Sequence, residues 1–132
     1  MGNGPVAWHT SKSRTVALSS SEAEGYALGN LTREIIWVNT LLNDLKVSML
    51  PIHVFDDAQN VLAWIRDKAI RARTRHIGVQ LNFVREADQD GTIVLDWVPG
   101  TEQIADCLTK PLARLLFERF YKLMGCQSIT QN

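Results

Sequence analysis

The stretch Pro51-Ile52-His53-Val54-Phe55-Asp56 is a short apolar run that begins at a proline and ends at a carboxylate. Its length and its apolar residues predict a buried β-strand. Residues 23–45 before it and residues 57–67 after it repeat apolar side chains every three or four positions, which predicts a helix on each side. A strand between helices indicates an α/β fold in which helices pack on a sheet that contains at least one parallel pair of strands.

The longest predicted helix begins after Ser19 and ends near residues 43–45. Ser19 and Glu22 form a capping-box pattern, which is typical of a helix start. Gly25 and Gly29 each cost roughly 1 kcal/mol relative to alanine inside a helix. They either allow a neighbouring element to approach closely or are only tolerated. The apolar positions that predict the helix are Ala23, Ala27, Leu31, Ile35, Val38, Leu42 and Leu45.

The rest of the chain predicts further short elements. Alternating residues 5–10 and 14–19 predict a β-hairpin, and residues 92–98 predict a strand after an Asp90-Gly91 turn. Helices are predicted over residues 74–88, 101–108 and 112–124, the last of them closed by Gly125. The four tryptophans fall on apolar faces and are expected in the core: Trp8, Trp37, Trp64 and Trp97.

The composition is that of one globular domain over residues 1–132, with 45% hydrophobic and 21% charged residues. Two cysteines without a CxxC pattern favour a reduced, intracellular protein, cytoplasmic or nuclear. Neither a signal peptide nor a membrane-spanning stretch is expected, so no membrane partner is predicted.

A formal net charge of zero means that any nucleic-acid contact must come from a local patch. The densest basic run in the chain is Lys68, Arg71, Arg73, Arg75 and His76. This run predicts either contacts to nucleic-acid phosphates or a solvated loop with charges at helix ends.

Three carboxylates suggest a catalytic metal site. Glu24 lies at a helix start, Asp56 at a strand end and Asp106 on a late helix. If they converge, these hard oxygen ligands suit Mg²⁺ or Mn²⁺ and two-metal hydrolysis of a phosphodiester. The alternative is that Glu24 and Asp106 are ordinary acidic residues that favour the helix dipole.

These motifs, in their order and spacing, resemble the ribonuclease H domain that ends the polyprotein of copia-type LTR retrotransposons. The resemblance rests on residues 8–12, 15–24, 34–37, 56–57, 73–77, 83–86 and 103–112. It implies a ribonuclease H-like fold, a mixed sheet flanked by helices, that cuts the RNA strand of RNA–DNA hybrids with two Mg²⁺ ions held by four carboxylates. Glu24, Asp56 and Asp106 match three of the four.

The fourth family carboxylate, on the first and central strand, has no counterpart, since no acidic residue precedes Glu22. The resemblance therefore implies a domain that lacks its first strand and has impaired catalysis. The exposed sheet edges favour a homodimer or a strand-donating protein partner. The alternative function is a host-adopted, non-catalytic module that self-associates or binds a protein or nucleic acid.

Overall fold

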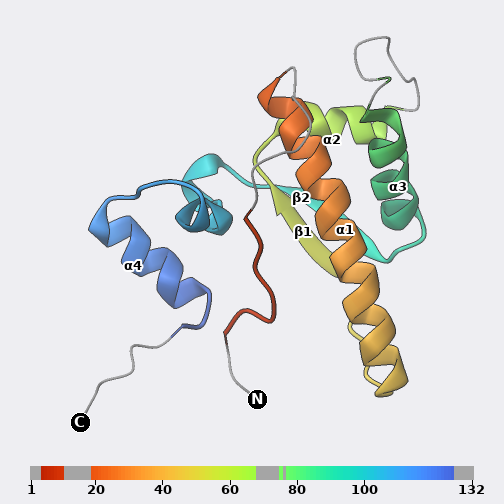
Figure 1. Cartoon of the computed structure of the whole chain (residues 1–132), viewed down its shortest axis with the longest axis horizontal. Coiled ribbons are helices and arrows are strands. Elements are labelled where there is room, and N and C mark those ends of the chain that lie inside the picture. Colours follow the sequence, from red (N-terminus) through yellow and green to blue (C-terminus); the bar gives the residue numbers. More distant parts are fainter. Residues whose placement is uncertain (1–3, 11–18, 68–74, 76, 127–132) are drawn as a thin grey trace. The chain divides into compact units, whose positions relative to one another are not determined.

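The computed structural model describes residues 4–10, 19–67, 75 and 77–126 (Figure 1). The chain divides into two compact units, Ser13–Gly100 and the combination of Met1–Lys12 with Thr101–Asn132. Each unit is described by itself, and the single domain over residues 1–132 stays a prediction.

The larger unit has a two-stranded parallel sheet. Strand β1 (Ile52–Asp56) pairs with β2 (Ile93–Trp97) in the register Ile52↔Ile93 to Asp56↔Trp97. This pair confirms the predicted α/β class and its parallel pair of strands. The outer edge of β2 is covered, because Leu95 N donates to Asp88 Oδ1 at 3.2 Å and Leu95 O accepts from Arg66 Nη2 at 3.1 Å. Side chains that bond an edge strand in this way block its pairing with another chain.

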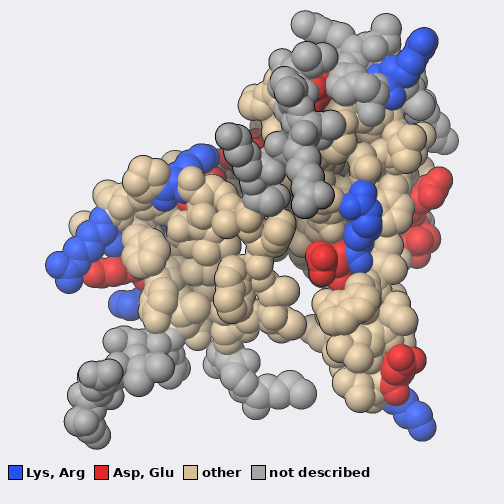
Figure 2. Space-filling view, viewed as in Figure 1, with Lys and Arg blue, Asp and Glu red and all other residues tan. Residues whose placement is uncertain are grey.

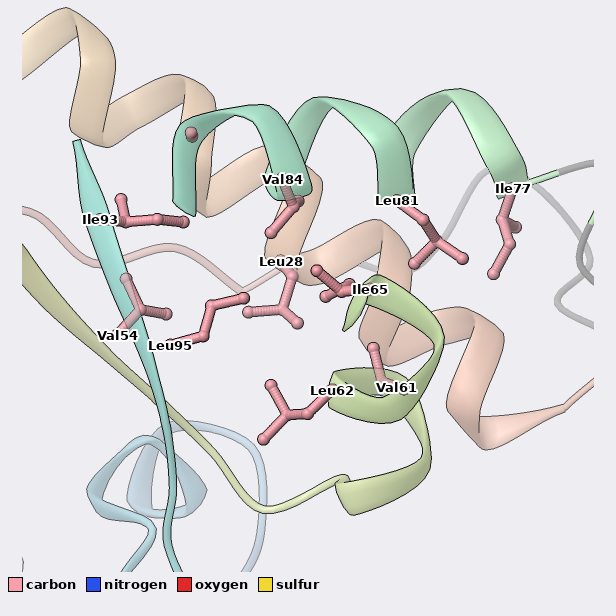
Figure 3. Close-up of a cluster of buried hydrophobic side chains, with 11 residues drawn as sticks. Leu28, Val54, Val61, Leu62, Ile65, Ile77, Leu81, Val84, Ile93 and Leu95 are labelled. Carbon is pink, nitrogen blue, oxygen red and sulfur yellow. The ribbon is translucent and has the colours of Figure 1, made fainter. Parts of the chain in front are cut away.

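Three helices of this unit surround one core. Helices α1 (Ser20–Asp44), α2 (Gln59–Arg66) and α3 (Gly78–Gln89) confirm three of the predicted helices. Figure 3 shows Leu28 of α1 pointing into the space between α2, α3 and the strands. The buried cluster is Leu28, Val54, Val61, Leu62, Ile65, Ile77, Leu81, Val84, Ala87, Ile93 and Leu95. The core therefore draws on every helix and strand of the larger unit.

Helix α1 begins where the sequence predicts and buries a different face. Ser19 caps it, with its side chain accepting from Glu22 N at 3.3 Å. The buried residues are Glu22, Gly25, Leu28, Gly29 and Thr32. Most of the predicted apolar stripe lies elsewhere, and Leu31 and Leu45 are 44% and 65% exposed. These two leucines face away from the core, because α3 packs against the glycines instead.

The glycines of α1 mark a close helix contact. A Cβ atom at Gly25 would lie 3.4 Å from the side chains of both Ile77 and Leu81. At Gly29 a Cβ would lie 2.5 Å from the Gln80 side-chain oxygen. Of the two alternatives that the sequence left open, the structure supports the close approach.

Hydrogen bonds of Arg85 join α3 to the end of α2. The Arg85 guanidinium of α3 donates to three carbonyl oxygens at the end of α2: Ile65 at 2.5 Å, Trp64 at 3.2 Å and Asp67 at 2.6 Å. These carbonyls belong to the last helical turn, which has no partners inside its own helix. Arg85 therefore acts as the C-terminal cap of α2.

The chain from Gly100 to Cys126, most of the described part of the smaller unit, forms two short 3₁₀ helices and one α-helix. Helix α4 (Arg114–Leu123) ends at Gly125, whose φ is 73°, and confirms the predicted last helix. Residues 101–108 were expected to form one helix, and the chain instead forms Gly100–Glu102 (η2) and Ile104–Leu108 (η3). Gln103, in an extended conformation, separates these two short helices.

The predicted hairpin is only partly tested. Residues 5–10 form no strand, which contradicts the first half of the prediction, and both Val6 and Trp8 are exposed. Of the second half, all but Ser19 lies outside the described residues. Among the described helices, none combines the length and the apolar character that a bilayer span needs.

The tryptophans were expected in the core, and this was wrong for three of the four. Trp8, Trp37 and Trp97 are exposed. Trp64 is partly buried and packs against the core cluster. Aromatic residues on an apolar periodicity thus do not all lie on the face that the fold buries.

The glycine contact predicts opposite effects of two substitutions at one position. Gly25→Ala adds a Cβ at ordinary contact distance and gains helix propensity, so we expect it to stabilise the protein by up to about 1 kcal/mol. Gly25→Leu overpacks the same contact and is expected to destabilise by about 1–3 kcal/mol. Urea unfolding followed by circular dichroism measures both. Equal effects of the two substitutions would contradict the close packing.

The capping role of Arg85 predicts a large loss on its removal. Arg85→Met leaves carbonyls of α2 without their donor, and we expect about 2–3 kcal/mol of destabilisation in urea unfolding. Arg33→Met is the control, because Arg33 makes surface contacts, with hydrogen bonds to the side chains of Asn30 and Gln80 and its guanidinium 6.0 Å from the Phe83 ring centroid, and should change stability by under about 1 kcal/mol. Similar losses in the two variants would argue against the cap.

Candidate functional site

Asp56, the last residue of β1, is a buried carboxylate. Side chains alternate along the strand, so Val54 and Asp56 point toward the core, and Asp56 is 5% exposed. Its Oδ1 accepts a hydrogen bond from Ala58 N at 2.6 Å, just before α2 begins. The bond holds the carboxylate at the turn from strand to helix, since Ala58 offers α2 no side-chain cap.

Burial raises the pKa of Asp56. The hydrogen bond from Ala58 N opposes this effect, and the neighbouring charge of Asp57 adds to it. Within the described segments, no Lys or Arg pairs with Asp56, and Oδ2 has no donor. A buried carboxylate without a cationic partner is destabilising unless it is protonated or binds a cation. Asp56 thus fits the chemistry of a divalent metal ligand.

The start of α1 lies at the same end of the larger unit as Asp56. The side-chain amide of Asn60, in the first turn of α2, donates to Ser21 Oγ in the first turn of α1. Because α2 follows β1 after two residues, this bond brings the acidic turn of α1 close to the end of β1. Glu24, the predicted ligand, lies in this part of α1 and is exposed.

Glu22 is a second acidic residue at this end that the sequence reasoning assigned only to the helix cap. It is 6% exposed, and it is with Asp56 one of the two buried carboxylates among the described residues. Two residues along a helix turn the side chain by about 200°, so Glu22 and Glu24 point to different sides of α1. Gly25 and Leu28, three and six residues later, lie on the same buried face, and this helical spacing is the signal in the sequence that could have identified Glu22 as buried.

Asp106 belongs to the smaller unit and lies in η3. Lys110 Nζ approaches its two carboxylate oxygens at 2.8 and 2.9 Å. The Asp106 side chain is 19% exposed, whereas that of Lys110 is 57% exposed, so the ion pair lies at the surface. Asp106 already has a cationic partner, and a metal ion would have to replace Lys110 there.

The structure thus brings two of the three predicted ligands, Glu24 and Asp56, to one end of the larger unit, and describes Asp106 in the other unit. Over the described ranges, no three His, Cys, Asp or Glu side chains form a group able to hold a metal ion. Of the predicted phosphate-binding residues, Arg75 is described and exposed. The others lie outside the described residues: Lys68, Arg71, Arg73 and His76.

A separate polar pair lies across the two strands. His53 Nδ1 is 2.7 Å from Asp96 Oδ2, and both side chains are exposed. His53 thus has a hydrogen-bonded partner on the neighbouring strand. His53 and Asp56 are three residues apart on a strand, so they point to opposite faces of the sheet and do not share a site.

The raised pKa of Asp56 predicts a pH-dependent stability difference. An acid whose pKa is higher in the folded state favours folding at low pH, and this contribution is lost as the pH rises through the folded pKa. Asp56→Asn keeps an oxygen for the Ala58 bond and carries no charge. We expect it to melt at a higher temperature than the unsubstituted chain at pH 7 in EDTA, with the difference vanishing as the pH falls below 4.

Asp57→Asn is the control, because it removes a neighbouring charge without removing the buried one. A small effect is expected there. An Asp56→Asn variant that is less stable than the unsubstituted chain at pH 7 would contradict the view of Asp56 as a destabilising buried charge.

Comparison with known proteins relates the chain to mobile elements. It is 30% identical over 126 residues to the retrovirus-related Pol polyproteins from transposons RE2 and RE1 of Arabidopsis thaliana, and 31% identical over 125 residues to that from transposon TNT 1-94 of Nicotiana tabacum. Each alignment covers 95% of the chain and 9% of the polyprotein.

No protein-family model matches the chain, and no solved structure matches it. The chain spans about a tenth of the curated relatives that it matches, at 9% of each. The three alignments nevertheless agree in kind and cover nearly the whole chain. They show that the chain is homologous to a region of the Pol polyproteins of copia-type retrotransposons.

Proposed function

We propose that the chain is a ribonuclease H-like domain whose ancestral activity is hydrolysis of the RNA strand of RNA–DNA hybrids. The homology of the chain to retrovirus-related Pol polyproteins supports this proposal. So does the resemblance of its motifs to the ribonuclease H domain of copia-type elements. The fold class agrees with it, since the parallel pair and its covering helices are compatible with part of a ribonuclease H-like sheet.

The observation that carries the proposal is Asp56. It is a buried carboxylate at the end of a strand, with a raised pKa and one oxygen that no described group binds. Groups whose pKa is shifted by burial are concentrated at functional sites. The Asn60–Ser21 bond joins the first turn of α2, which follows Asp56, to the acidic first turn of α1.

In this proposal Glu24, Asp56 and Asp106 hold Mg²⁺ or Mn²⁺. Such ions activate the attacking water and stabilise the leaving oxygen in two-metal hydrolysis. The residues before Glu22 contain no Asp or Glu, so this chain supplies three carboxylates where the family uses four. We therefore expect weak metal binding and low activity of the chain by itself.

Substrate binding is proposed for the basic run of Lys68, Arg71, Arg73, Arg75 and His76. Contacts of these side chains to phosphates would make the affinity for a hybrid fall with salt. With zero net charge on the whole chain, this local run would have to supply the attraction.

A second candidate function is a non-catalytic module, adopted by the host of the element. The pair of Asp106 and Lys110 favours it, because a carboxylate neutralised by a lysine at 2.8 Å is not prepared to receive a metal ion. In this case the domain would bind nucleic acid or protein without cleaving it.

Cleavage of a hybrid with a labelled RNA strand, in Mg²⁺ and then in Mn²⁺, tests the proposal. We expect slow, metal-dependent cutting of the RNA strand that Asp56→Asn abolishes and Glu24→Gln reduces at least tenfold, or about 1.4 kcal/mol. Glu22→Gln shows whether the buried glutamate contributes. Asp44→Asn is the matched control, because Asp44 is an exposed acid at the far end of α1. This variant should cleave the hybrid as fast as the unsubstituted chain.

The same samples separate the two functions. Salt-sensitive binding of the hybrid without cleavage, equal in Asp56→Asn, would reject the nuclease and support the non-catalytic module. Cleavage that survives Asp56→Asn would show that the activity does not use this site.

A further inference from the structure

The two cysteines of the chain belong to neighbouring elements of the smaller unit. Cys107 lies in η3, which packs against α4, and Cys126 follows α4. The Cys107 thiol contacts the sulfur of Met124, the C-cap residue of α4, with 3.9 Å between Sγ and Sδ. Both cysteines are free and partly exposed. The contact therefore brings the thiol of η3 to the end of the helix that the other cysteine follows.

The end of α4 holds Cys126 in a defined position. The N–H of Gly125, a residue with a φ of 73°, donates to Lys122 O at 2.9 Å, and the N–H of Cys126 donates to Tyr121 O at 3.2 Å. These two bonds form a Schellman motif, in which the chain turns back against the last helical turn. Cys126 is thus held beside the end of α4, two residues from the methionine that Cys107 contacts.

The two thiols also interact electrostatically. Burial raises the pKa of Cys107, a hydrogen bond with its own backbone lowers it, and the charges of Cys126 and Asp106 raise it further. Charges near the surface act on one another only over short distances, because salt screens them beyond about 10 Å. The electrostatic effect and the sulfur contact agree that Cys126 lies near Cys107.

We propose that Cys107 and Cys126 form a reversible intramolecular disulfide that ties η3 to the end of α4, with a small disulfide of the glutathione type as the oxidant. The bond would close a loop that contains the whole of α4. Closing such a loop restricts the unfolded chain more than the folded one. Oxidation is therefore expected to stabilise the packing of η3 against α4.

The reaction consists of two thiol–disulfide exchanges. One cysteine, as the thiolate, attacks a sulfur of oxidised glutathione, forms a mixed disulfide and releases one glutathione thiolate. The other cysteine then attacks the protein sulfur of this mixed disulfide, which forms the Cys107–Cys126 bond and releases the second glutathione thiolate. Each cysteine gives up one proton and each released glutathione takes one up. Two protein thiols are thus oxidised and one glutathione disulfide is reduced, and reduced glutathione reverses both steps.

The opposite side of α4 offers a matched control position. Lys122 is exposed and lies two residues before Met124, which is about 200° around the helix. Figure 2 shows basic and acidic side chains gathered along the surface of α4. A cysteine at position 122 is therefore close to position 126 along the chain, but it lies on the side of α4 away from the Cys107 contact.

Mass spectrometry of the whole chain, after equilibration with reduced and oxidised glutathione, tests the proposal. We expect a single chain that is lighter by about 2 Da, the two hydrogen atoms lost, and a proteolytic fragment in which Cys107 and Cys126 are joined. Cys107→Ser should carry one glutathione instead. The double change Lys122→Cys, Cys126→Ser should form at least tenfold less internal disulfide at the same glutathione ratio. Circular dichroism checks that each variant is folded.

Three results would overturn the proposal. Two of them are glutathione on both cysteines without an internal bond, and two free thiols in an excess of oxidised glutathione, since either shows that the sulfurs do not reach each other. The third is equal bond formation from position 122, which shows that the contact with the end of α4 does not select the pair. The assay contains no metal ion and no nucleic acid, so this inference and the nuclease proposal fail independently.

Discussion

The contact of α1 with α3 through Gly25 and Gly29 determines how the larger unit is organised. Because neither glycine has a side chain, α3 approaches the helix backbone closely, and the side chains of Ile77 and Leu81 lie 3.4 Å from the position that a Cβ would occupy at Gly25. The contact fixes the rotation of α1 about its axis. Leu28 consequently enters the core, and the leucines on the other side of the helix face outward.

That rotation also sets the environment of the candidate site. With Ser21 turned toward Asn60, the first turn of α1 lies beside the turn that follows β1. Asp56 then occupies a place where a hydrophobic side chain would stabilise the fold better. A carboxylate at this buried position lowers the stability of the protein, as groups retained for function commonly do. Asp106 differs from Asp56, because the charge of its carboxylate is balanced by the ion pair with Lys110.

The sequence predicted the positions of helices and strands better than it predicted which side chains are buried and what they contact. The capped start of α1 at Ser19, the strand at 52–56 and the glycine-ended α4 follow from local chemistry, and the structure confirms them. Which face of α1 is buried depends on a contact with a helix about 50 residues away, and periodicity counts apolar residues without identifying their partner. The same reason explains why Trp37 and Trp97 are exposed. Asp56 was predictable as a strand-end acid, whereas its burial and the pairing of Asp106 with Lys110 depend on tertiary structure.

Helix α1 carries apolar side chains that the described part of the larger unit does not cover. A helix that is apolar on one side needs one partner, and a helix that is apolar on two sides needs two. The glycine side of α1 packs against α3, and Ile35 is partly buried against the core. Leu41 and Leu45 are exposed to solvent. The two surfaces lie at different ends of the helix, because the glycine contact is near Glu24 and the exposed Leu41 and Leu45 are near Lys46. A substitution at one end of α1 can therefore alter one of these surfaces without the other.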